Sequence, residues 1–378
     1  MTKKLKDAFI YLLVCASKNE KVNTEYIEDV SLDDIYTIAS FHKVAALIGY
    51  ALSNSQITHK KFTETIARSM KRQALFEIER KKIIDFLKSN DIPFMLLKGV
   101  IIEKYYPKTY LREMTDNDIF FDYHYLNKVT DYFIKNGYTQ YNTDEIAVLQ
   151  GCYSFHKEPV YNFEMHTKLF SDNLFKELND YYGDVFSKLD KKENYEYEFN
   201  INDLYIFFTL HEYKHYNYAG TGLRGFVDNY LIRTKLKDEL DFVYIDNELK
   251  KIGAYEFEKM RNSIVDKIFC DPFDYSLDEN EEKLFADYLT SGVYGTDKHL
   301  TERILKRELN KSRYESEKLK RIDYLFRCFT GSKEIYEKKY PVLSKHKVFM
   351  PVCFVLRFFS GVFRGRISEE IGKLHKYK

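Results

Sequence analysis

Residues 94–122 read FMLLKGVIIEKYYPKTYLREMTDNDIFFD and carry the clearest fold signal in the chain. Residues 94–97 form a short continuous apolar run, typical of a buried strand, and Lys98-Gly99 ends it. A helical pattern follows over 100–106, and residues 118–122 are a second strand candidate. This alternation of strand and helix predicts a sheet covered by helices.

The flanking sequence extends this pattern. A helix is predicted over 125–135, where Asn136-Gly137 supplies a stop signal. Alternating residues at 153–156 and 160–166 predict a hairpin. We therefore expect an α+β protein with a small mixed-sheet core at 91–200, an N-terminal helical region at 1–90 and a C-terminal helical domain at 201–378.

Composition restricts the class of protein. The 378 residues include 59 Lys and Arg against 58 Asp and Glu, which gives a net charge of +1. A nearly neutral chain is not expected to bind long nucleic acid non-specifically through its overall charge. An acidic ligand would therefore have to be bound by a local cluster of basic residues. The five cysteines are odd in number and widely spaced, which indicates reduced thiols in a cytoplasmic protein. They are Cys15, Cys152, Cys270, Cys328 and Cys353.

No segment has the pattern of a membrane anchor. The apolar run near the N-terminus is interrupted by Asp7, and we interpret it as an amphipathic helix. Residues 348–363 are apolar but contain Pro351 and Arg357, and they are fewer than the ~20 residues that a spanning helix needs. We expect a buried helix there, with a helix on a membrane surface as the alternative, and no membrane insertion.

Two acids at the start of the second strand candidate indicate metal chemistry. Asp116 and Asp118 are two residues apart, so a strand would place both carboxylates on one face. Like charges this close need a compensating cation, and hard oxygen ligands suit Mg²⁺ or Mn²⁺ bound together with substrate phosphates. A third acid, Glu164, shares a strand face with His166. The alternative is that an Asp-x-Asp pair caps a solvated turn.

The turn at Lys98-Gly99 suggests a phosphate site. Gly99 would let the backbone approach a triphosphate where a helix begins, and Lys98 would add a positive charge. A lysine at a strand end is otherwise an ordinary surface residue.

Together these residues resemble a family. The run 96–99, the segment Tyr105-Tyr106-Pro107 and Arg112, four residues before Asp116, look like the signature of the uncharacterised bacterial nucleotidyltransferases of the polymerase-β-like superfamily. The resemblance implies a nucleotidyltransferase fold for the sheet core, a metal triad of Asp116, Asp118 and Glu164, and a phosphate turn at Gly99. Arg112 would orient the start of the strand or a phosphate.

The resemblance extends beyond the sheet. Residues 41–45 look like an early helix of the family, and residues 211–228 look like its helical substrate-side block. His211, His215 and Arg224 would then face the nucleotide, as would His166. The alternatives are that the histidines hydrogen-bond within the core and that Arg224 pairs with Asp228. The sequence departs from the superfamily pattern at Asn117, where an aliphatic residue is usual, and at Lys98-Gly99, where Gly-Ser is usual.

Two other motifs are weaker. Residues 211–215 read HEYKH, the pattern of a zinc metalloprotease, but no third-ligand motif follows. Residues 220–225 match G-x-G-x-x-G but follow a predicted helix, so they indicate an interhelical turn.

The expected function is transfer of a nucleoside monophosphate from a nucleoside triphosphate to an acceptor, with release of pyrophosphate. The acceptor is a small molecule or a protein in preference to long nucleic acid. A non-catalytic nucleotide-binding or antitoxin-like module on the same fold is the alternative.

Overall fold

The structure is a computed structural model that describes residues 1–141 and 150–330. Its contacts define two compact units, one made of Met1–Tyr216 and Thr221–Tyr294 and the other of Asn217–Gly220 and Gly295–Lys378. The boundaries expected at residues 90 and 200 lie inside the first unit and remain predictions.

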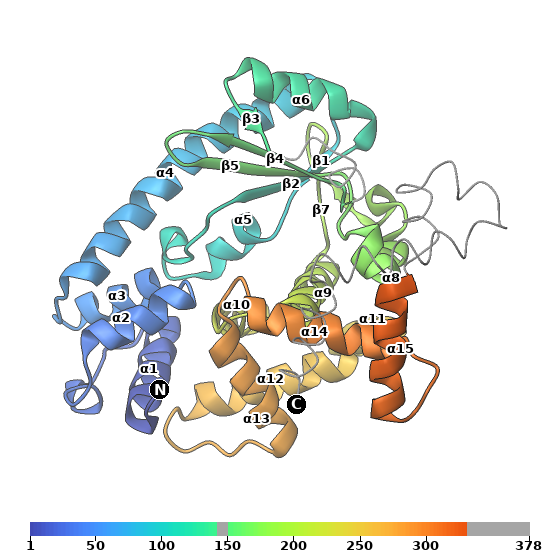
Figure 1. Ribbon diagram of the computed structural model, residues 1–378. Coiled ribbons are helices and arrows are strands. Elements are labelled where there is room, and N and C mark those ends of the chain that lie inside the picture. The colour runs from blue at the N-terminus through green and yellow to red at the C-terminus, as the bar shows by residue number, and fades with distance from the viewer. Residues whose placement is uncertain (142–149, 331–378) are drawn as a thin grey trace, which may run out of the picture. The chain divides into compact units, whose positions relative to one another are not determined.

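The first unit contains a seven-stranded mixed sheet of order β3-β4-β5-β2-β1-β7-β6. Strand β2 runs parallel to β5, β1 runs parallel to β7, and the other neighbours are antiparallel. The sheet lies among many helices (Figure 1), so the α+β prediction is confirmed. The strands are β1 (Phe94–Leu96), β2 (Asn117–Phe121), β3 (Thr139–Gln140), β4 (Cys152–Lys157), β5 (Tyr161–His166), β6 (Asp190–Lys191) and β7 (Glu196–Glu198).

One face of the sheet is apolar. Side chains that alternate along β2, β4 and β5 pack there against the second half of α4 and against α6, which lies over this face in Figure 1. Stacked Phe133 and Phe155, with ring centroids 4.2 Å apart, join α6 to β4. The alternate residues of the same strands, including Asp118 and Glu164, therefore point to the opposite face.

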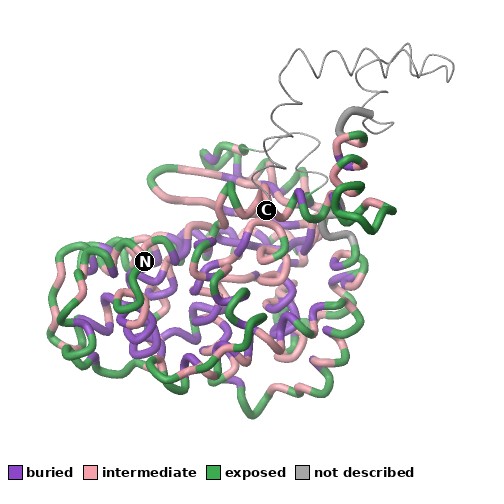
Figure 2. The backbone as a smooth tube through the Cα atoms, turned by 60° about the horizontal axis from the view of Figure 1, so that its bottom comes forward, coloured by how far each residue is buried: buried purple, intermediate pink, exposed green. Residues whose placement is uncertain are grey.

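Helices cover that opposite face. A second and larger core joins Met95 and Phe120 of the sheet to α1, α3, α9 and α10. In Figure 2 the buried residues, drawn in purple, gather inside this unit. The helices of the first unit are α1 (Lys3–Lys18), α2 (Leu32–Phe41), α3 (Ala45–Asn54), α4 (Lys60–Ser89), α5 (Gly99–Ile102), α6 (Leu126–Lys135), α8 (Asp172–Tyr182), α9 (Ile201–Tyr218, whose last two residues group with the second unit), α10 (Arg224–Lys235), α11 (Phe242–Ile252), α12 (Tyr255–Cys270) and α13 (Glu279–Ser291).

The described part of the second unit consists mainly of α14 (Asp297–Asn310) and α15 (Glu317–Thr330). Leu305 and Leu309 of α14 pack against Tyr324 of α15 and form a small core of their own. The apolar run at 348–363 lies outside the described residues. Within the described ranges, no helix is long and apolar enough to cross a lipid bilayer.

Most of the expected elements are present. The strands at 94–97 and 118–122, the helix at 125–135 and the hairpin are confirmed within one or two residues. Two expectations differ. Residues 99–105 form a four-residue helix followed by a 3₁₀ turn. Residues 42–44 form a turn between α2 and α3, in which Lys43 has a φ of 54°.

A buried polar cluster ties α4 to the sheet. Arg80 donates a hydrogen bond to Oδ1 of Asn117 at 2.8 Å and pairs with Glu103 at 3.4 Å. Gln73 also donates to Glu103, at 2.9 Å. Asn117 is fully buried, so the polar residue that replaces the usual aliphatic one in β2 has a partner behind the strand.

We expect Arg80→Met to lower the free energy of unfolding by about 3 kcal/mol, because it leaves the Glu103 carboxylate buried without a cation. Adding Glu103→Gln removes that charge and should recover part of the loss. Urea denaturation of the two variants measures both effects. A double variant no more stable than Arg80→Met would contradict this account of the cluster.

Candidate functional site

Three carboxylates meet where β2 and β5 lie side by side. Asp118 and Glu164 are register partners in this parallel pair, and neighbouring strands lie ~4.8 Å apart. Asp116 comes one residue before β2 begins, so it is presented by a loop and not by the strand as expected. Burial, and then the charges of Asp118 and Glu164, raise the pKa of Asp116 to about 6. The three acids therefore share one strongly negative environment.

Two cationic groups compensate this charge. Lys98 Nζ lies 2.5 Å from Asp118 Oδ1, and His166 Nε2 lies 2.8 Å from the same oxygen. Burial alone would raise the pKa of Asp118, but Lys98 and His166 outweigh it and hold that pKa far below its usual value. Burial likewise opposes the charged form of Lys98, yet Asp118 and Glu164 raise its pKa.

Cys152 borders the acids on the next strand. It is the register partner of His166, and its Sγ lies 3.8 Å from Oε2 of Glu164. His166 Nε2 is 3.6 Å from that same oxygen. Burial opposes protonation of His166, but Cys152 and the hydrogen bond to Asp118 keep its pKa well above the usual value.

The turn after β1 is tight. Lys98 has a φ of 50°, a conformation that side-chain-bearing residues rarely adopt. A Cβ at Gly99 would lie 2.5 Å from Met114 Sδ and 2.7 Å from Arg112 Nη1, so only glycine fits without a shift. The helix that starts here has only four residues, too short to provide the helix-terminal phosphate site that we expected.

The loop before Asp116 is held at successive residues. The main-chain oxygen of Glu113 accepts from Arg224 at 2.8 Å, and its carboxylate accepts from the Ala46 amide at 2.9 Å. Arg72 donates to the carbonyl of Met114 at 3.3 Å. These contacts come from three different helices, so they fix the position of Asp116 relative to the sheet.

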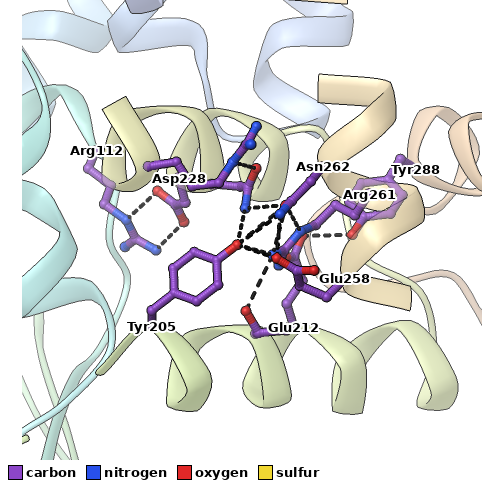
Figure 3. Close-up of polar contacts among 11 residues, drawn as sticks. Arg112, Tyr205, Glu212, Asp228, Glu258, Arg261, Asn262 and Tyr288 are labelled. Atoms are coloured by element: carbon purple, nitrogen blue, oxygen red, sulfur yellow. Dashed lines mark hydrogen bonds and ion pairs between the residues drawn. The ribbon is translucent and has the colours of Figure 1, made fainter. Parts of the chain in front are cut away.

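Arg112 is committed to an ion pair. Its Nε and Nη2 donate to the two carboxylate oxygens of Asp228 at 3.0 and 2.8 Å (Figure 3), and Tyr106 donates to Asp228 at 2.7 Å. The fork-shaped guanidinium and the carboxylate match in geometry. Because Asp228 is paired with Arg112, the interpretation of Asp228 as a partner of Arg224 is wrong.

Helix α9 brings three basic side chains to the acids. His211, Lys214 and His215 are three and four residues apart, so they share one helix face. Burial, then Lys214, lowers the pKa of both histidines well below the usual value, and their Nε2 atoms lie 3.2 Å apart. Burial, and then the charge of Lys98, lowers the pKa of Lys214 to about 8. No ion pair to Lys214 occurs within the described ranges.

The HEYKH motif does not form a protease site. Its glutamate, Glu212, pairs with Arg261 at 2.6 Å and accepts from Tyr288 at 2.7 Å, inside the buried network of Figure 3. A glutamate held in this way cannot act as a general base on water. Among the described residues, the one group of three side chains with metal-ligand geometry is Cys152, Glu164 and His166, which excludes the helical histidines.

The structure thus gathers most of the proposed residues. Electrostatic interactions link Asp116, Asp118, Glu164, Lys98, His166, His211, His215 and Arg224. Arg112 and Gly99 instead shape the loop and the turn beside them. Sequence reasoning missed Lys214 and Cys152. The spacing of Lys214 from His211 was a usable signal, whereas Cys152 is recognisable only from the register of β4 against β5.

A mixed sheet that carries paired carboxylates on the face opposite α4 and α6 is consistent with a nucleotidyltransferase core. A family model described as "Uncharacterised nucleotidyltransferase" matches residues 28–265, more than half of the chain, and the chain belongs to this family. The resemblance stated from the sequence is therefore confirmed. No curated protein and no solved structure matches the chain.

We expect Asp228→Asn to lower the free energy of unfolding by about 3–5 kcal/mol, because it leaves the Arg112 guanidinium buried without its counter-charge. The matched control is Asp266→Asn, which removes the exposed partner of Arg233 and should cost less than about 1 kcal/mol. Thermal or urea unfolding measures both. Equal losses in the two variants would show that the Arg112 pair does not support the loop.

Proposed function

We propose that the protein is a metal-dependent nucleotidyltransferase. It would bind a nucleoside triphosphate, and an acceptor hydroxyl or phosphate would attack the α-phosphorus and displace pyrophosphate. The observation that carries the proposal is the convergence of Asp116, Asp118 and Glu164 beside Lys98, since a cluster of this charge is stable only with compensating cations.

The donor set fits a hard divalent cation. Asp116, Asp118 and Glu164 offer carboxylate oxygens, the ligands that Mg²⁺ and Mn²⁺ prefer, and burial, followed by the negative charges of Asp118 and Glu164, raises the pKa of Asp116. These three residues would hold the metal, which when bound would polarise the phosphate oxygens and stabilise the charge that develops during transfer.

The remaining side chains have separate roles in this proposal. Lys98 from the sheet and Lys214 from α9 would bind the triphosphate from two sides as positive charges. Arg224, His166, His211 and His215 would line the same space. Glu164 completes the acid set on the adjoining strand and is the carboxylate available to take the proton of an acceptor hydroxyl.

The acceptor would come from the helical side. The near-neutral charge of the chain favours a small molecule or a protein over long nucleic acid. The unbridged cysteines Cys15, Cys152 and Cys270 suit the cytoplasm, where we propose that the enzyme acts.

We expect Asp116→Asn with Asp118→Asn to reduce transfer by a hundredfold or more, because removing the metal ligands removes several kcal/mol of transition-state stabilisation, with about 1.4 kcal/mol for each tenfold. Transfer of label from α-labelled triphosphate to an acceptor, in the presence of Mg²⁺, measures it. The matched control is Asp122→Asn, just beyond the other end of β2, which should keep full activity.

Circular dichroism establishes that the double variant is folded. Undiminished transfer by that folded variant would contradict the proposal. Triphosphate binding by the wild-type protein without turnover on any acceptor would point instead to a non-catalytic nucleotide-binding module.

Lys214 predicts a pH dependence of nucleotide binding. Its pKa is about 8, so its positive charge is present below that pH and is lost above it. The groups that face it are Lys98, Asp118, Glu164 and Cys152 from the sheet and the two histidines of α9. We expect the affinity for triphosphate to fall severalfold as the pH rises from 7 to 9, as roughly one charge contact is lost.

Substitution of Lys214 by arginine distinguishes the effect of the positive charge from the effect of side-chain packing. Lys214→Arg keeps a charge that does not titrate and should flatten the pH profile, whereas Lys214→Met should bind weakly at both values. Calorimetric titration at pH 7 and 9 measures all three proteins. An unchanged profile in Lys214→Arg would assign the pH effect to another group.

A further inference from the structure

Cys152, Glu164 and His166 form a second constellation at the edge of the acid cluster. They come from adjacent antiparallel strands, and their ligand atoms all lie within 4.8 Å of one another. We propose that these three side chains bind Zn²⁺ or a comparably soft divalent ion, and that this ion inhibits the enzyme by taking Glu164 out of the acid set. The inhibition rests on the proposed function, but the binding does not.

The distances suit a tetrahedral ion. Bonds of about 2.3 Å to sulfur and about 2.1 Å to nitrogen or oxygen separate the ligands of a tetrahedral zinc by roughly 3.4–3.6 Å. Here Cys152 Sγ is 3.8 Å and His166 Nε2 is 3.6 Å from Glu164 Oε2. These two separations are therefore within a few tenths of an ångström of the tetrahedral values, and all three ligand atoms lie within 4.8 Å of one another.

The ligand atoms of this site differ from those of the proposed magnesium site, which are carboxylate oxygens. A thiolate and an imidazole are ligands that select zinc, whereas magnesium takes oxygen ligands almost exclusively. Asp118 Oδ1 lies 2.8 Å from His166 Nε2 and would be the fourth ligand, or the group that accepts a hydrogen bond from a bound water. The ligand set thus resembles a zinc site more than a general acid cluster.

Binding has a defined balance of protons and charge. The Cys152 thiol and the His166 Nε2 each give up a proton to the solvent as bonds to the ion form. The thiolate and the Glu164 carboxylate then neutralise the two positive charges of the ion. Lys98 would repel it, but Asp118 already compensates Lys98 at 2.5 Å.

Occupation of this site would disable transfer. Glu164 would either bridge the zinc and the magnesium ion or bind the zinc alone. The contact between His166 and Asp118 would also be broken. The result is an enzyme that is active with Mg²⁺ and is inhibited by zinc through a residue that the transfer reaction does not use, Cys152.

The binding test uses Co²⁺ as a spectroscopic substitute for zinc. We expect the wild-type protein to bind about one equivalent and to show a thiolate-to-cobalt charge-transfer band in the near ultraviolet. Cys152→Ser should lose that band and weaken zinc binding more than about tenfold, comparable to the loss when a metal's supporting groups are removed. The matched control, Cys270→Ser, changes an exposed unbridged cysteine and should retain both properties.

A second variant separates this site from the helical histidine pair. His211→Ala should leave the cobalt band unchanged, because neither histidine of α9 belongs to the cluster. A band that survives in Cys152→Ser, a band lost in His211→Ala, or the absence of a band in the wild-type protein would each overturn the proposal.

The activity test is separate. Micromolar zinc should inhibit Mg²⁺-dependent transfer by the wild-type protein, and Cys152→Ser should keep its basal activity and need more than about ten times as much zinc. If zinc-free protein binds cobalt through Cys152 but shows no transfer activity, the proposed metal site stands and the proposed function is contradicted. Equal zinc sensitivity of both proteins would overturn the regulatory role.

Discussion

The parallel pairing of β2 with β5 is the constraint on which the site depends. Its register places Asp118 opposite Glu164, so two carboxylates are held one strand spacing apart on the same face. Such an arrangement is unfavourable by itself, and Lys98 and His166 offset it through Asp118. A shift of β2 by one residue against β5 would place Asp118 opposite Phe163 or Met165 and turn its carboxylate into the apolar core that α4 and α6 cover.

The loop that carries Asp116 depends on helices far away in the sequence. Arg112 is held by Asp228 of α10, Glu113 by Arg224 and the start of α3, and Met114 by Arg72 of α4. All of these contacts lie within residues 28–265, the span that the family model matches. The helical regions position an acid as well as covering the face on which it lies.

The sequence predicted the strands and the family because those signals are local. Period-two alternation reveals β4 and β5, and the acid spacing marks the strand that carries Asp118. It could not predict that Arg112 pairs with Asp228 or that Cys152 faces His166, because both pairings join segments whose spatial relation only the fold determines. The short α5 was missed for a similar reason: its apolar residues suit a longer helix, but the chain turns into a 3₁₀ segment.

Buried Arg261 has a consequence for α9. Its guanidinium donates hydrogen bonds to Glu212 and Tyr205 of this helix (Figure 3) and to Thr209. Gly225 lies so near Glu212 that an added methyl group would clash with the carboxylate. The helix is thereby prevented from rotating about its own axis. If Lys214 binds phosphate as proposed, the helix that carries it is already fixed in place, so less binding free energy would be spent on ordering it.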